Sequence, residues 1–193
     1  MFLGLILEEN TMTEKFSGSP KTQWSGNRNM VLLEDFSYTD PDDKEWVAQA
    51  GSAINGASIP KALWSSVGAP YVGKYRRASV VHDVAVGEGG AEGVSASERR
   101  KADKMFYSAC RFDGCSRRFA AVLYIGVSIG TWTSVFSSLF SGSLEKDEED
   151  ISDTPEDKMI RMKFDEILGQ LEADLDTINF DDLEKAVNAK LPI

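Results

Sequence analysis

The residues that could carry chemistry are concentrated in two short segments, "NGASIP" at 55–60 and the "HD" that begins at His82. His82 is the single histidine of the chain, Asp83 follows it, and Ser58 stands in the first segment. Histidine, serine and carboxylate side chains are the groups that general acid–base and nucleophilic catalysis use. His82, Asp83, Asp103 and Ser58 are therefore the candidate catalytic residues of a small hydrolase.

The spacing of these residues limits that chemistry. A single histidine excludes an H-E-x-x-H zinc site, and an HD-type phosphohydrolase needs further metal-binding histidines. Pro60 stands where the G-x-S-x-G elbow around a nucleophilic serine needs glycine. No spacing among His82, Asp83, Asp103 and Glu88 demands a metal, so we predict no metal site. No cofactor can be named, and whether the protein is an enzyme stays open.

Helix geometry favours structural roles for the same residues. The segment 74–87 predicts a helix whose inner side carries Tyr75, Ala78, Ser79, His82 and Val86. We expect His82 to be hydrogen-bonded beneath the Asn55–Pro60 turn. Asp83 points about 100° away from it.

Asp83 is expected to pair with an arginine instead, the choices being Arg76, Arg99 and Arg100. Ser58 is expected to cap the turn that starts at Pro60. The residues expected to line a binding site beside that turn are Asn55, Gly56, Trp64 and Tyr75.

The elements around these residues predict an α+β fold. A strand at 29–40, a turn at 40–43 and a returning strand at 44–54 form a hairpin or small antiparallel sheet, after a loop at 10–28. This sheet packs on three to four helices, one of them opened by a capping box at Ser95 and Glu98. The opening "MFLGLILEEN" lacks the features of a signal peptide and predicts a first strand or buried arm.

The segment from Phe119 to Leu144 has no charged residue, and two interpretations of it are possible. Residues 119–140 are long enough to span a bilayer, and Gly126 and Gly130 form a G-x-x-x-G pattern. The run is also rich in serine and threonine, which favours a central helix of a small domain. A membrane-associated protein is therefore an alternative that we do not favour.

The net charge of −10 belongs to the end of the chain, because residues 145–193 hold 16 acidic and 6 basic residues. We predict a core domain at 1–144, an acidic linker at 145–158 and an amphipathic helical hairpin at 159–193. This extension is expected to dock on the core or on a protein partner. A nucleic-acid partner is disfavoured because the body lacks a broad basic stripe. Two cysteines, expected as reduced thiols, indicate a cytoplasmic protein.

Several motifs in this order resemble a family of bacterial and phage proteins, the domain-of-unknown-function family 1353. The resemblance covers roughly residues 30–135 and rests on "NGASIPKALW", "YRRASVVHDVA" and "SERRKADKMF". It marks Gly56, Ala57, Ser58, Ile59, Pro60, Trp64, Tyr75, His82, Asp83, Ala102, Asp103 and Phe106. Asn55 stands where the family usually carries an acid, and an amide cannot act as a base. The resemblance implies no reaction, so we expect a phage- or bacterial-type accessory or interaction protein, with the hydrolase as the alternative.

Overall fold

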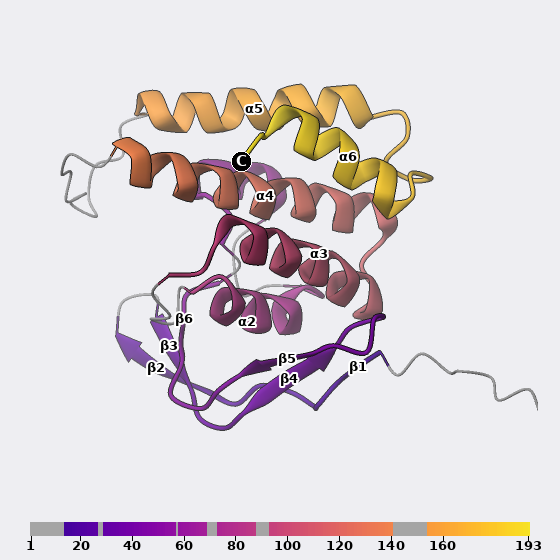
Figure 1. Ribbon diagram of the computed structural model, residues 1–193. Coiled ribbons are helices and arrows are strands. Elements are labelled where there is room, and N and C mark those ends of the chain that lie inside the picture. Colours follow the sequence, from indigo (N-terminus) through magenta and orange to yellow (C-terminus); the bar gives the residue numbers. More distant parts are fainter. Residues whose placement is uncertain (1–13, 27–28, 57, 69–72, 88–92, 141–153) are drawn as a thin grey trace, which may run out of the picture.

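Two small antiparallel sheets lie at one end of the molecule, and helices are stacked on them layer by layer (Figure 1). The computed structural model describes residues 14–26, 29–56, 58–68, 73–87, 93–140 and 154–193. The opening segment and most of the acidic linker lie outside these residues. The α+β prediction, with strands first and a helical hairpin last, is confirmed.

Each sheet has three strands. The first has the order β1 (Lys15–Phe16), β4 (Phe36–Thr39), β5 (Glu45–Ala48). The second has the order β2 (Thr22–Gly26), β3 (Asn29–Leu32), β6 (Ala53–Ile54). The predicted hairpin is present as β4 and β5, joined by a turn at Asp40 to Asp43.

The strand boundaries differ from the prediction. The expected strand at 29–40 is broken into β3 and β4, which belong to different sheets, because Leu33 to Asp35 turn the chain. The returning strand divides in the same way into β5 and β6, with Gly51 at a φ of 86° between them. The Asp35 carboxylate accepts the Ala50 N–H at 2.8 Å and so joins the two breaks. The predicted loop at 10–28 contains β1 and β2.

The helices follow in chain order and build the layers. They are η1 (Lys61–Leu63), α1 (Trp64–Val67), α2 (Arg76–Ala85), α3 (Ala96–Phe112), α4 (Arg117–Phe140), α5 (Pro155–Leu171) and α6 (Phe180–Lys190). In Figure 1, α2 lies on the sheets, α3 on α2, and α4 on α3, while α5 and α6 cover α4. The capping box of Ser95 and Glu98 at the start of α3 is confirmed.

Helix α4 is the central helix of this stack. Within the described part of the chain, Arg117–Phe136 is the one helical stretch long and apolar enough to cross a membrane, and 61% of it is buried inside the protein. Leu123, Ile125 and Ile129 are fully buried. Its apolar residues are therefore largely used in packing against α3, α5 and α6.

The C-terminal extension packs on α4 through its apolar stripe. Ile160, Phe164 and Ile167 of α5 and Leu183 and Val187 of α6 are buried. Helix α5 begins at Pro155, inside the stretch predicted as linker, because Thr154 and Asp157 form a second capping box.

Arginines of the body hold the extension at its polar rim. Arg117 donates to the carbonyl of Thr177, Arg118 pairs with the Glu172 carboxylate, and Arg100 donates to the carbonyl of Leu191 at 2.6 Å. Arg100, Arg117 and Arg118 thus serve contacts within the chain.

Candidate functional site

The turn after β6 is anchored by a buried carboxylate from α2. Asp83 Oδ2 accepts the backbone N–H of Asn55 at 3.1 Å and that of Gly56 at 2.8 Å. Asp83 is completely buried, and Gly56 has a φ of 101°, which is a left-handed conformation that favours glycine. A carboxylate that accepts two amide hydrogens ties the helix to this backbone conformation.

The histidine lies on the other buried side of α2, against α3. His82 Nε2 is 2.8 Å from Asp103 Oδ1, and neither residue is exposed. The His82 ring also packs on Phe106, with 5.0 Å between the ring centroids. His82 Nδ1 and Asp103 Oδ2 have no hydrogen-bond partner among the described residues. The pair therefore joins α2 to α3 within the core.

Two structural predictions for these residues are wrong. Asp83, rather than His82, lies at the Asn55–Pro60 turn, and Asp83 does not take Arg76, Arg99 or Arg100 as its hydrogen-bond donor there. The prediction assumed that α2 has one buried side. Because α2 lies between the sheets and α3, positions 100° apart on it are both buried.

Ser58 does not cap the following helix either. Pro60 is the N-cap residue of η1, and no side chain caps it. The Ser58 hydroxyl is buried and has no hydrogen-bond partner in the described part of the chain. The turn is held from this side by Trp64, whose indole N–H donates to the Ile59 carbonyl at 3.0 Å.

The turn also lies directly on α4, at the two glycines of the G-x-x-x-G pattern. A Cβ atom at Gly126 would lie 3.4 Å from the Ile59 side chain, while one at Gly130 would overlap the Ser58 carbonyl oxygen. Gly126 therefore makes room for the Ile59 side chain, and Gly130 makes room for the backbone at Ser58. The sequence contained this signal, but the pattern suggested helix–helix contact in a membrane.

The predicted binding residues are spread over the surface and interior of this region. Asn55 is exposed, Gly56 is buried, and Trp64 is half-buried. Tyr75 is 3% exposed and packs edge-on against Phe119 at 5.8 Å. Of these four, Asn55 and Gly56 contact Asp83 through their backbone. A binding role for the four residues stays a prediction.

Of the candidate catalytic residues, His82 and Asp103 are hydrogen-bonded to each other. Asp83 instead binds the backbone of the turn that contains Ser58. A His–Asp pair of this geometry can hold an imidazole in one tautomer and orientation. Its complete burial keeps bulk solvent from the ring in this conformation. Over the described ranges, no three side chains among His, Cys, Asp and Glu gather as metal ligands would.

Fold and site together define an α+β module in which a buried carboxylate and two glycines tie α2 and α4 to one turn, while a His–Asp pair joins α3 to α2. Residues 30–127, about half of the chain, match the family described as "Protein of unknown function (DUF1353)". The chain belongs to this family, as the motifs at 55–60, 82–83 and 98–106 predicted.

Two relatives come from Sinorhizobium fredii (strain NBRC 101917 / NGR234). The uncharacterized protein y4jT is 41% identical over 71 residues, which are 35% of this chain and 21% of that protein. The uncharacterized protein y4iH is 40% identical over 53 residues, 28% of this chain and 22% of that protein. The chain thus matches only about a fifth of the length of these relatives. No solved structure matches the chain.

Proposed function

We propose that this chain is an accessory protein of phage or bacterial type that binds another protein through its extension, residues 159–193. The observation that carries the proposal is the outer face of α5. Its inner stripe is used up on the core, yet Met159 and Met162 remain 37% and 63% exposed one turn apart. Methionine is an adaptable side chain that suits protein-binding surfaces.

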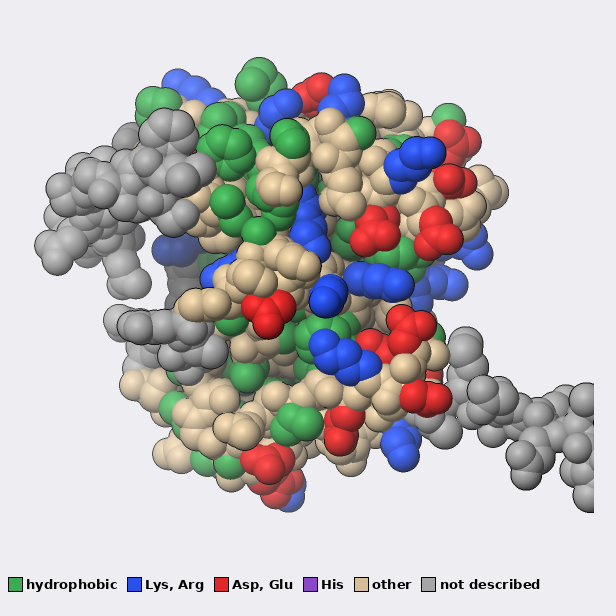
Figure 2. Space-filling model, in the orientation of Figure 1, with side chains coloured by type: hydrophobic (Ala, Val, Ile, Leu, Met, Phe, Trp, Pro, Cys, Tyr) green, Lys and Arg blue, Asp and Glu red, His purple; other side chains and the backbone are tan. Residues whose placement is uncertain are grey.

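The charge at the other end of α5 indicates the kind of partner. Acidic residues are exposed from the end of α5 to the start of α6, namely Glu172, Asp174, Asp176, Asp181 and Asp182. Figure 2 shows hydrophobic side chains over the beginning of α5 and acidic ones over the region where α5 leads into α6. A partner surface with an apolar patch opposite the methionines and a basic patch opposite the acidic end of the extension complements this face, whereas nucleic acid does not.

A pull-down with the full-length protein from the cells that encode it tests the proposal. The test variant is Met159→Lys with Met162→Lys, and the control is Leu33→Lys, since Leu33 is 54% exposed far from the extension in the chain. We expect the wild type and the control to retain one specific protein that the double variant loses. Recovery that is unaffected by the double variant, or no recovery at all, contradicts the proposal.

A hydrolase is the second candidate, and it is favoured by the Nδ1 of His82, which has no hydrogen-bond partner among the described residues. In a His–Asp dyad, one ring nitrogen faces the carboxylate and the other faces the reacting group. The complete burial of His82 speaks against this candidate.

Because the chain has one histidine, reaction with diethyl pyrocarbonate reads the accessibility of His82 directly. For a structural His82, we expect modification only after unfolding in urea. Rapid modification of the native protein, together with turnover of p-nitrophenyl acetate or p-nitrophenyl phosphate that His82→Gln abolishes, supports the hydrolase instead.

We propose a cytoplasmic location, which the state of the cysteines supports. Cys110 and Cys115 are buried free thiols that are hydrogen-bonded to each other, and burial raises the pKa of Cys110 well above its usual range. The same hydrogen bond lowers the pKa of Cys115. Buried reduced thiols are typical of a reducing compartment. The packing of α4 against its neighbours favours a core helix over a membrane anchor.

A further inference from the structure

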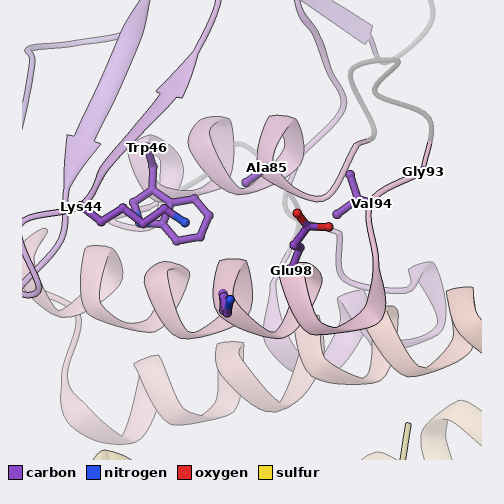
Figure 3. Close-up of a pocket in the computed structure, with 7 residues that line it drawn as sticks. Lys44, Trp46, Ala85, Gly93, Val94 and Glu98 are labelled. Atoms are coloured by element: carbon purple, nitrogen blue, oxygen red, sulfur yellow. The ribbon is translucent and has the colours of Figure 1, made fainter.

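A cavity of about 440 Å³ lies between the edge of the first sheet, the end of α2 and the start of α3, away from the α5 face. Its lining residues are Lys44, Trp46, Ala85, Gly93, Val94, Glu98 and Lys101. Figure 3 shows Lys44 lying along Trp46 on one side and Glu98 near Val94 on the other. This volume lies within the range of pockets that bind small molecules.

Trp46 and Lys44 are held in place by Asp40. Asp40 is 8% exposed, and its Oδ2 accepts the Trp46 indole N–H at 2.8 Å while its Oδ1 accepts the Lys44 backbone N–H at 3.0 Å. The Lys44 ammonium lies 3.4 Å from the centroid of the Trp46 ring, a cation–π contact. The Asp40 carboxylate is thus used in hydrogen bonds to Trp46 and Lys44. The Lys44 ammonium is held on the wall of the cavity by the Trp46 ring.

The opposite wall of the cavity carries one carboxylate, that of Glu98, and one ammonium group, that of Lys101. Glu98 Oε2 accepts from the Ser95 N–H at 3.0 Å and the Ser95 hydroxyl at 2.7 Å, so it belongs to the capping box of α3. These hydrogen bonds lower the pKa of Glu98, and the nearby Lys101 and Lys44 lower it further. Among the described residues, no carboxylate lies within 4 Å of the Lys44 or the Lys101 ammonium. The cavity therefore holds two ammonium groups against one carboxylate.

We propose that this cavity binds a small organic anion, whose carboxylate or phosphate lies between Lys44 and Lys101 and whose apolar part rests on Ala85 and Val94. Lysine binds such oxyanions as a compact point charge. The Lys44 ammonium lies on the face of the Trp46 ring, so a ligand bound to Lys44 also lies near that ring.

The indole N–H signal of Trp46 in a ¹H–¹⁵N NMR spectrum reports occupancy, and Trp46→Phe assigns that signal. We expect phenyl phosphate or benzoate, titrated into the full chain, to shift the signal in a saturable manner. Benzyl alcohol, which has the ring without the charge, is expected to leave it unchanged. The stronger of the two anions identifies the ligand class as phosphate or carboxylate.

Two variants and one control locate the site. Lys44→Gln and Lys101→Gln should each weaken binding about tenfold, because each removes a charged hydrogen-bond donor. Lys104→Gln removes an exposed charge from the same helix outside the cavity and should leave the affinity unchanged. No saturable shift with either anion, equal binding of benzyl alcohol, or equal weakening by Lys104→Gln overturns the proposal.

Discussion

Two regions of this protein are attached to α4 in different ways. The turn at 55–60 lies on α4 where Gly126 and Gly130 leave room for it, and the Asp83 carboxylate of α2 holds it from the other side. The extension is held by a stripe of buried apolar side chains with arginines at its rim. The first attachment depends on backbone position, whereas the second depends on buried area. In the extension, the loss of stability should therefore follow the apolar volume that a substitution removes. At the turn, it should follow whether the backbone can keep its position.

The largest expected effect is in the extension. Phe164, which is 2% exposed, should cost about 3–5 kcal/mol of unfolding free energy when changed to alanine, because the change leaves a cavity against the core. Urea denaturation followed by circular dichroism measures this loss. Phe164→Leu should cost much less, and Met162→Ala, on the exposed face of the same helix, should leave stability unchanged. Equal losses for all three variants would contradict a stripe that contributes by buried area.

Removing the Asp83 carboxylate should have the next largest effect. Asp83→Ala should lower the unfolding free energy by about 3 kcal/mol, because two amide donors lose their acceptor beside a buried helix. Asp83→Asn keeps one acceptor oxygen and should lose less, while Asp42→Ala at an exposed site should lose little. Thermal unfolding of the three variants compares them. A wild-type melting temperature for Asp83→Ala would show that the turn does not depend on this carboxylate.

The two glycines of α4 should respond differently to the same methyl group. Gly130→Ala should cost about 1–3 kcal/mol, because the new Cβ overlaps the Ser58 carbonyl and the backbone must move. Gly126→Ala meets only the Ile59 side chain at 3.4 Å and should cost less. Chemical denaturation of both variants gives the difference. Equal effects would mean that the close approach at Gly130 adds nothing to the attachment of the turn.

The smallest effect should be a gain. Gly169 lies in α5, and a Cβ there would meet nothing within 4 Å. Gly169→Ala should raise the unfolding free energy by about 0.5–1 kcal/mol, through helix propensity alone. A loss of stability in the same denaturation assay would indicate a contact on this face of α5 that its exposure does not reveal.

The periodic elements of this fold were predictable from the sequence, and the relations between distant residues were not. The stripes of α2, α3, α5 and α6 follow the helical repeat, and Ser95 with Glu98 marks a cap within four residues. The break at Leu33 to Asp35 depends instead on a bond from Asp35 to Ala50, far along the chain.

The site shows the same limit. His82, Asp83 and Asp103 were identified as candidates, but the contact with the turn was assigned to His82 and belongs to Asp83, because a helix buried on two sides offers no single inner face. The G-x-x-x-G pattern marks Gly130, but it does not show that the backbone of Ser58 is what packs there. The cavity at Trp46 was missed altogether, since its residues come from a hairpin and two helices.

Helix α4 has a consequence for how this protein can be divided. The family region ends at Val127, whereas the helix continues to Phe140 and receives the Ser58 carbonyl at Gly130. The region shared with the family and the structure that packs around the turn therefore have different boundaries. A fragment that ends at Val127 would cut α4 in the middle. It would also lack Gly130, on which the 55–60 turn packs.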